Sequence, residues 1–450
     1  MTTSDEPDSS LFSTVPVTSA AQTKRMHEAA KAADVKRSGK SDTGNIIIGV
    51  EYASPGMAST YSRLGITGVK YYPEEFKWGG MQCGKCSKID FKAMDKFVTE
   101  YQNSGFTDIV LSLKPVSSWA SINAVTNFAP KTKFMGLFEK WVAAIAERYD
   151  KDGSSDMDGL KYPVNLIEIG IEFSSYEPEP AEDYINMLEH AYKAAHAASD
   201  TVKILHSAFL AGLAFVSDPA PENYEEAFAA VDKRIMVHSL DDMRKILDRP
   251  DIFDVADFHA LCYPGEIEQT VRWLKYEMSQ RGYSKPIVIG DTSVNPFSGY
   301  GSALVTQGTA SQLSVLSPPA KEADRERLKT YFTNLINKDK ASLEWVHAFC
   351  ATDMVKKVVI SAEQGVMAVN TAFMEEYAPS KTMLFGAAAG NSIWSGMTLT
   401  AVKPFSNERD IKEIRPSFYA VGQLAAHLKG YTAVEKISVA DKDLKIYKVT

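Results

Sequence analysis

Two kinds of hydrophobic pattern alternate along this chain from residue 45 onward. Short continuous apolar runs predict strands that are buried on both faces, as in a parallel sheet. Longer segments in which apolar residues recur every three or four positions predict amphipathic helices. The predicted strands cover, in chain order, residues 45–52, 68–72, 108–113, 165–169 (running on to Glu172), 202–206, 252–259, 286–290 and 343–350.

Helical segments separate these predicted strands. They cover residues 57–64, 90–103, 133–149, 182–197, 266–281 and 323–337, with a broken helical region over 222–247. Eight strands that each lead into or follow a helical segment predict an α/β protein with the (β/α)8 TIM-barrel fold. A doubly wound open sheet is the alternative, but no glycine-rich phosphate loop follows the first strand.

The chain divides into three predicted parts. Residues 1–43 are rich in serine, threonine, aspartate and lysine, which indicates a flexible leader. Residues 44–430 would form the barrel. Residues 431–450 follow the last predicted helix and would begin a small C-terminal β-extension.

Charge and hydropathy exclude several classes of partner. The net charge of −8, without long basic runs, argues against nucleic acid. No apolar run approaches the roughly 20 residues that span a bilayer, so we expect no membrane partner. The first 20 residues lack the pattern of a secretory signal, so the protein would be cytoplasmic, or secreted if a leader has been removed. The oligomeric state stays open.

The cysteines and histidines do not predict a metal or cofactor site. Four cysteines are too few for a disulfide framework in 450 residues. Cys83 and Cys86 form a lone CxxC, which leaves a local disulfide and free thiols as alternatives. His206 and His347 are expected in strands, and no HxH or HExxH spacing occurs. We therefore expect no metal and no cofactor.

Candidate chemistry lies at the predicted C-terminal ends of strands, where barrel active sites are built. Glu172 ends the fourth strand, His259 the sixth, with Tyr263 shortly after it, and Asp291 the seventh. Two carboxylates that face each other across a cleft can cleave a glycosidic bond, because one protonates the leaving oxygen while the other attacks or stabilises the anomeric carbon. Glu172 and Asp291 are the predicted catalytic pair.

Several segments resemble clan A glycoside hydrolases, the retaining (β/α)8 superfamily. EIGIEFSSY (168–176), DVADFHALCYPG (254–265) and KPIVIGDTS (285–293) resemble its segments at strands four, six and seven. The resemblance covers about residues 45–450. It implies hydrolysis of a glycosidic bond in an oligo- or polysaccharide, with Glu172 as acid/base, Asp291 as nucleophile, and His259 and Tyr263 at the site.

Two positions depart from the superfamily's pattern. The asparagine before the acid/base is Ile171, and the nucleophile position holds Asp291, which is one methylene shorter than glutamate. Retaining enzymes need carboxyl groups about 5–5.5 Å apart, so a shorter arm favours inverting geometry unless the backbone shifts. The alternative function is a non-catalytic glycan-binding or scaffold barrel derived from a glycosidase. The sugar, the linkage, and endo or exo action stay open.

Aromatic and polar residues near strand ends are the predicted substrate-binding set. Aromatic faces stack on the apolar faces of sugar rings, and nearby polar groups bind the hydroxyls. For each aromatic residue, packing of its loop onto the barrel is an equally weighted alternative. The predicted residues are Trp78, Trp119, Tyr176, His259, Tyr263 and Asn295.

Overall fold

The computed structural model describes most of the chain from residue 46 onward. The described residues are 46–51, 53–174, 177–231, 236–261, 263–294, 330, 333–335, 337–371, 375–377, 396–402, 409–439 and 445–450. The predicted leader, Tyr176, Asn295 and most of the helix expected at 323–337 lie outside these residues.

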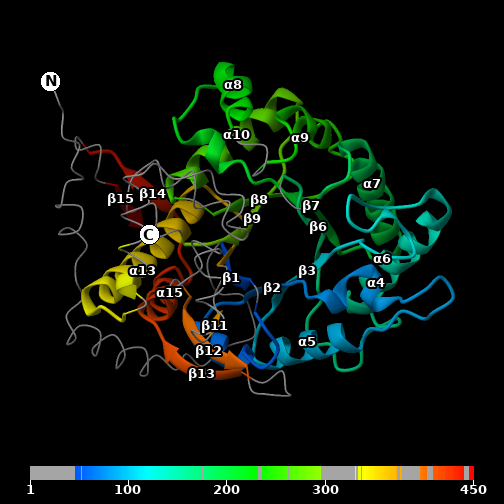
Figure 1. Cartoon of the computed structure of the whole chain (residues 1–450), viewed down its shortest axis with the longest axis horizontal. Helices are drawn as coiled ribbons and strands as arrows, with labels where there is room; N and C mark the ends of the chain where they lie inside the picture. Colours follow the sequence, from blue (N-terminus) through cyan, green and yellow to red (C-terminus); the bar gives the residue numbers. More distant parts are fainter. Residues whose placement is uncertain are drawn as a thin grey trace.

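Eight parallel strands form one sheet, in the spatial order β7-β6-β3-β2-β1-β10-β9-β8. Isolated parallel bridges, Leu205 to Val255 and Phe209 to Phe258, link the two ends of this order and produce a nearly closed barrel (Figure 1). The predicted (β/α)8 fold is confirmed. The strands are β1 Ile47–Glu51, β2 Gly68–Tyr71, β3 Asp108–Leu113, β6 Leu166–Glu172, β7 Lys203–Ala208, β8 Ala256–Ala260, β9 Ile287–Thr292 and β10 Ala368–Thr371.

Helices surround the barrel (Figure 1). They turn apolar stripes inward, as in α5, which buries Met94, Phe97, Val98 and Tyr101. The helices are α3 Ala58–Tyr61, α4 Trp78–Met81, α5 Lys92–Asn103, α6 Met135–Tyr149, α7 Ala181–Ala198, α8 Tyr224–Ala229, α9 Leu240–Leu247, α10 Gly265–Gln280, α13 Lys340–Glu363 and α15 Pro416–His427.

The prediction of the eighth strand is wrong. Residues 343–350 lie in the long helix α13, and β10 takes the place of the eighth strand. The helix begins after Asp339, whose side chain accepts a hydrogen bond from the Ser342 backbone N–H. A dense apolar run that fits a strand also fits a buried helix, and the N-cap decides between them here. His347 and Cys350 are therefore helical residues.

The barrel interior changes from apolar to polar along its axis. Its apolar floor is made by single residues from six positions around the barrel: Val110, Leu166, Leu205, Val255, Val288 and Ala368. Beyond the floor, the fully buried Lys70, Ser112, Glu168 and Asp257 form a polar layer. Gly290 makes room for this layer, because a Cβ there would lie 2.7 Å from a carboxylate oxygen of Asp257 and 2.9 Å from Lys70 Nζ.

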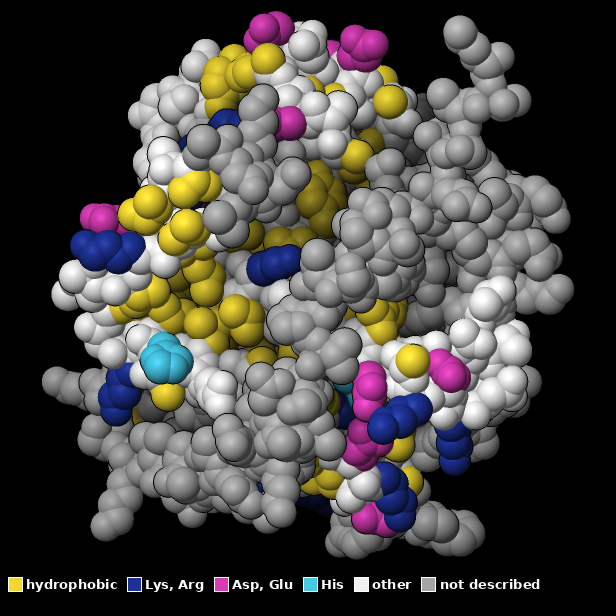
Figure 2. All heavy atoms as spheres, turned by 90° about the vertical axis from the view of Figure 1, so that its left-hand side faces the viewer, with side chains coloured by type: hydrophobic (Ala, Val, Ile, Leu, Met, Phe, Trp, Pro, Cys, Tyr) yellow, Lys and Arg dark blue, Asp and Glu magenta, His cyan; other side chains and the backbone are white. Residues whose placement is uncertain are grey.

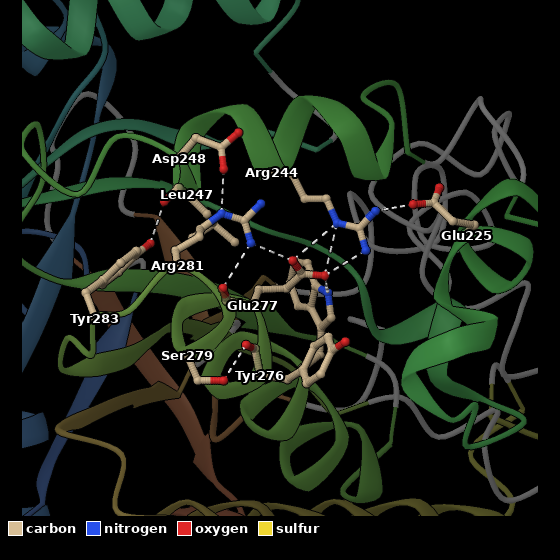
Figure 3. A network of polar contacts seen from close by, with 10 residues as sticks. Glu225, Arg244, Leu247, Asp248, Tyr276, Glu277, Ser279, Arg281 and Tyr283 are labelled. Carbon is tan, nitrogen blue, oxygen red and sulfur yellow. Dashed lines mark hydrogen bonds and ion pairs between the residues drawn. The ribbon is translucent and has the colours of Figure 1, made fainter.

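A buried carboxylate joins two of the outer helices (Figure 3). Glu277 on α10 accepts hydrogen bonds from Arg244 of α9 at 2.9 Å and from Arg281 at 2.7 Å. The Trp273 indole N–H lies 3.3 Å from the same carboxylate. Each guanidinium also reaches an exposed acid, Glu225 for Arg244 and Asp248 for Arg281 (Figure 3).

Smaller sheets decorate the barrel. β4 Ser121–Asn123 and β5 Asn127–Pro130 form a hairpin after β3, and β11 Glu375–Tyr377, β12 Thr398–Val402 and β13 Arg409–Ile414 form a three-stranded sheet. The C-terminal hairpin pairs β14 Val434–Ile437 with β15 Ile446–Val449, which confirms the predicted β-extension.

The surface is mixed in character. Figure 2 shows hydrophobic side chains gathered over the central and left-hand parts of one face, with charged side chains mostly nearer its margins. Exposed large hydrophobic residues of the described chain concentrate in the two hairpins, and they include Ile122, Val125, Ile437, Val439, Ile446 and Val449. Among the described residues, no helix is long and apolar enough to cross a bilayer.

Candidate active site at the barrel mouth

Strand β6 carries Glu172 into the barrel mouth through a β-bulge. Ile169 pairs with His206 and Glu172 pairs with Ala208, so β6 has one more residue than β7 over this stretch. Gly170 takes a φ of 93°, a conformation that favours glycine. The Glu172 side chain follows this bulge and is only 3% exposed. Simple alternation along the strand places Glu168 and Glu172 on one face, and in the structure both turn towards the interior, Glu168 to Lys70 and Glu172 to His259.

The side chain of Glu177 binds the backbone of the bulge in β6. Its Oε1 accepts a hydrogen bond of 2.8 Å from the Ile171 N–H, the residue next to Glu172. Glu177 is fully buried and lies 3.9 Å from Lys114 Nζ. Burial, and then the neighbouring Glu177 charge, raise the pKa of Glu179 to about 8. A second acidic pair thus lies behind the strand end, and the sequence analysis did not anticipate it.

Strand β9 carries Asp291 and bulges in the same way. Ile289 pairs with Val369 and Thr292 with Thr371, which gives β9 one extra residue relative to β10. Its pairing with β8 shifts at the same place. Bulges commonly re-aim a side chain at an active site, and this bulge lies where the shorter aspartate stands.

His259 connects the two carboxylate positions. Its Nδ1 lies 2.9 Å from Glu172 Oε1, and its backbone is the register partner of Asp291. Burial, assisted by Lys70, lowers the pKa of His259 to about 4, so the ring is neutral at neutral pH. A neutral imidazole can donate to an ionised Glu172 or accept from a protonated one.

Asp291 is buried in the same electrostatic environment as Glu172. Burial raises the pKa of Asp291, and the charge of Glu172 raises it further, while His259 and Lys70 oppose these effects. The two predicted catalytic carboxyls are therefore near enough to influence each other electrostatically.

The ammonium group of Lys70 pairs with the buried acids below the mouth. Lys70 Nζ lies 3.0 Å from Glu168 Oε2 and 3.6 Å from Glu51 Oε1, and Ser112 also donates to Glu168. Burial alone would lower the pKa of Lys70, but Glu168, Glu51 and Asp257 outweigh it, and the pKa rises. Lys70 is therefore a fixed positive charge beneath the site.

Glu51 is a site residue that the sequence analysis missed. It ends β1, is fully buried, and neither of its carboxyl oxygens has a hydrogen-bond partner among the described residues. Burial raises its pKa well above the usual range, and Asp291 adds to this effect. The signal was present in the sequence, since Glu51 ends a buried strand as Glu172 does.

The predicted substrate-binding residues occupy different environments. Trp78 is fully buried and packs on Trp119 and Trp141, so the packing alternative describes it in this structure. Trp119 is half-buried and donates to the Gln82 carbonyl oxygen at 2.8 Å. Tyr263 donates through its hydroxyl to Gln269 at 2.6 Å. Tyr176 and Asn295 lie outside the described residues.

The CxxC thiols and a cluster of three aspartates lie apart from Glu172 and Asp291. Cys83 and Cys86 are free and exposed, so of the two alternatives the structure has free thiols. Asp150, Asp152 and Asp156 bring carboxylate oxygens within 4.8 Å of one another. They lie in the segment between α6 and the N-terminal end of β6, at the opposite end of the barrel from the mouth.

Comparison with known proteins identifies the fold. No protein-family model and no curated protein matches the sequence. A family 39 glycoside hydrolase from the gut symbiont Bacteroides cellulosilyticus WH2 is similar in structure, with 12% identity and a TM-score of 0.54 over 91% of this chain and 69% of that one. A glucosidase from Croceicoccus marinus has 11% identity and a TM-score of 0.50, over 86% and 68% of the two chains. A family 39 enzyme from Xanthomonas axonopodis pv. citri has 10% identity and a TM-score of 0.50, over 89% and 69%.

The chain therefore has the (β/α)8 fold of these glycoside hydrolases. The resemblance to clan A seen in the sequence is confirmed at the level of the fold. At about 10% identity the likeness concerns the fold, and function has to be argued from the site.

Proposed function

We propose that this protein hydrolyses a glycosidic bond of an oligo- or polysaccharide with two carboxylates. One observation carries the proposal: Glu172 and Asp291 end strands four and seven, both are buried, and His259 lies between them in contact with Glu172. A buried pair of acids at a barrel mouth suits acid and nucleophile chemistry, because repulsion between neighbouring carboxylates disfavours joint ionisation and so separates their protonation states.

The proposed reaction has two steps. Glu172 gives its proton to the glycosidic oxygen as the bond from that oxygen to the anomeric carbon breaks, and Asp291 forms a bond to the same carbon. Water then attacks the anomeric carbon, returns a proton to Glu172 and releases the Asp291 carboxylate. The sugar leaves with a new hydroxyl, and no oxidant or reductant is consumed.

The shorter Asp291 supports a second route at the same site. If Asp291 stands too far from the anomeric carbon, it acts as a base that takes a proton from water on the opposite face of the sugar. The bulge at Gly290 favours direct attack, because it moves the backbone where the arm is short. The anomeric configuration of the first product, measured by proton NMR, separates retention from inversion.

Ile171 supports a particular substrate class. Its side chain is nearly buried and offers no hydrogen bond to the sugar next to Glu172. The contact to the 2-hydroxyl of an ordinary glycoside strengthens in the transition state, so its loss favours sugars in which the 2-position is not a free hydroxyl. Substrates that are deoxy or substituted at this position belong in the first screen.

Turnover and binding should be measured on the same variants. Aryl glycosides and oligosaccharides are screened with wild type, Glu172→Gln and Asp291→Asn, with exposed Glu226→Gln as the control. We expect Glu172→Gln and Asp291→Asn to abolish turnover of oligosaccharides that lack an aryl leaving group, while calorimetry still detects binding.

The departures at Ile171 and Asp291 favour the second candidate, a glycan-binding barrel. Binding without turnover by the wild type would support that candidate instead.

A further inference from the structure

Glu51 lies where three charged side chains meet. It ends β1, and none of its surface is exposed. Its Oε1 is 3.6 Å from Lys70 Nζ, and both of its carboxyl oxygens are buried without a hydrogen-bond partner in the described part of the chain. Oδ1 of Asp291, on a strand two positions away in the barrel, is likewise buried without a partner there, and the two carboxyls interact electrostatically. Neither the resemblance nor the two-carboxylate mechanism gives this residue a task.

Neighbouring buried carboxyls disfavour joint ionisation. Two unit charges about 4 Å apart repel by about 4 kcal/mol even at an effective dielectric constant of about 20. Carboxylates only accept hydrogen bonds, so a hydrogen bond between these two groups requires a proton on one of them. A proton on one member of the pair Glu51 and Asp291 would relieve this repulsion and would give the unpartnered buried oxygens a donor.

The surroundings decide which residue carries that proton. Lys70 makes its shorter contact, 3.0 Å, with Glu168, and this leaves Glu51 only the longer contact of 3.6 Å. Burial, Asp291 and Glu168 all disfavour a charge on Glu51. On the other side of the pair, His259 and Lys70 favour a charge on Asp291, and a hydrogen bond from Glu51 favours it further.

We propose that Glu51 is a positioning residue that carries the shared proton and donates a hydrogen bond to the Asp291 carboxylate. Its role in turnover rests on the proposed glycosidase function. The hydrogen bond fixes the orientation of a short side chain that the bulge in β9 has already displaced. It also keeps Asp291 ionised, as attack on the anomeric carbon or activation of water requires.

The charged groups that face Glu51 come from three other strands. They are Lys70 from β2, Glu168 from β6 and Asp291 from β9. Glu172 and His259 face Asp291 from the remaining side. Lys70 is the cation among these groups, and its shorter contact is with Glu168. Its charge therefore does not neutralise a second carboxylate at Glu51.

Infrared difference spectroscopy tests the location of the proton without any substrate. At neutral pH, Glu51→Gln should remove one protonated-carboxyl band from the wild-type spectrum, whereas Asp291→Asn should keep that band and shift it. If Asp291→Asn removes the band and Glu51→Gln leaves it unchanged, the proton is on Asp291 and the proposal is overturned. Two variants keep the test decisive should one fail to fold.

Stability against pH gives a second readout that does not involve turnover. An unfolded glutamate ionises near pH 4.3, while Glu51 stays protonated in the folded protein, so its contribution to stability falls as the pH rises above about 4.3. Glu51→Gln removes this loss. Its denaturant midpoint should therefore rise relative to wild type between pH 4 and pH 7. Parallel midpoints over this range would overturn the proposal.

Turnover then tests the positioning role. Glutamine can donate the same hydrogen bond, so Glu51→Gln should keep kcat within about threefold of wild type. Glu51→Ala cannot donate it, and kcat should fall on the order of 100-fold with little change in KM, as small misplacements of reacting groups do. Equal losses in both variants would overturn positioning by a hydrogen bond. If no glycoside is turned over, the proposed function fails, while the infrared result still decides where the proton lies.

Discussion

Removing the charge of Glu277 should destabilise the whole barrel, although Glu277 lies on the outside of the sheet (Figure 3). In Glu277→Gln, the amide nitrogen would face a guanidinium donor, because Arg244 and Arg281 donate to both carboxylate oxygens of Glu277. Each lost hydrogen bond to a charged group costs about 1.5–3 kcal/mol. The guanidinium groups still reach water and their exposed partners, so we expect a total loss of about 3 kcal/mol.

The magnitude can be checked in two ways. Unfolding entropy is about 2.1 cal/mol/K per residue, or about 0.8 kcal/mol/K for a folded part of roughly 400 residues, so about 3 kcal/mol corresponds to a fall of about 4 °C in Tm. Guanidinium chloride titration, followed by tryptophan fluorescence and circular dichroism, gives the free energy directly. Calorimetry measures Tm on the same samples.

The same arginine supplies the matched control. Glu225 also contacts Arg244, but its side chain is 71% exposed whereas that of Glu277 is 3% exposed. Glu225→Gln should cost at most about 1 kcal/mol, as exposed ion pairs do. Equal losses in the two variants would refute the reasoning that burial makes the contribution of Glu277 to the free energy of unfolding large. A loss below about 1 kcal/mol in Glu277→Gln would refute it too.

Three further predictions concern the buried polar groups. Glu177→Ala should lower kcat on the order of 100-fold with KM little changed, because the bulge at Ile171 loses its acceptor; Glu177→Gln, which keeps an acceptor, should be nearly normal. Burial lowers the pKa of His206 to about 4, so the folded protein should lose up to about 3 kcal/mol of stability as the pH falls from about 6.5 to 4. In denaturant titrations, His206→Gln should make the free energy of unfolding depend less on pH over this range. Lys357 is buried and donates to the Ser293 carbonyl oxygen just beyond β9, so Lys357→Met should lower kcat without abolishing ligand binding by calorimetry.

Each of these outcomes has a counterpart that would contradict it. A normal kcat in Glu177→Ala would show that the bulge holds its shape without the side-chain acceptor. An unchanged pH slope in His206→Gln would place the titrating groups elsewhere. Loss of ligand binding together with kcat in Lys357→Met would indicate a general collapse of the strand ends, and exposed Lys356→Met on the same helix is the control for that case.

Much of the fold was predictable because barrel strands are short apolar runs separated by helical segments. The runs that end at Glu172 and Asp291 were placed within a few residues of β6 and β9. The run at 343–350 misled the prediction, since dense apolar residues fit either kind of element and the cap at Asp339 was not weighed. The true strand, β10, is only four residues long.

The interior of the mouth was less predictable. Lys70 and Glu168 are 98 positions apart in the sequence (168 − 70), and they form an ion pair only because the barrel brings β2 and β6 into one polar layer. The barrel likewise brings Glu51 of β1 near Asp291 of β9, although the two residues are far apart in the sequence. Local patterns specify which residues form a strand, but contacts between distant strands depend on the closure of the sheet. The two bulges also escape the pattern, since a strand read by simple alternation contains no extra residue.

The extra residue in β9 has a consequence for anyone who redesigns this mouth. An added residue shifts the alternation of inward and outward side chains, so the segment of β9 before Gly290 and the segment after it follow different counts. A loop transplanted from a barrel with regular strands would enter in the wrong phase and would turn its polar residues towards the helices. Grafts beyond Asp291 should therefore be numbered from Gly290, with this glycine kept as a fixed reference point.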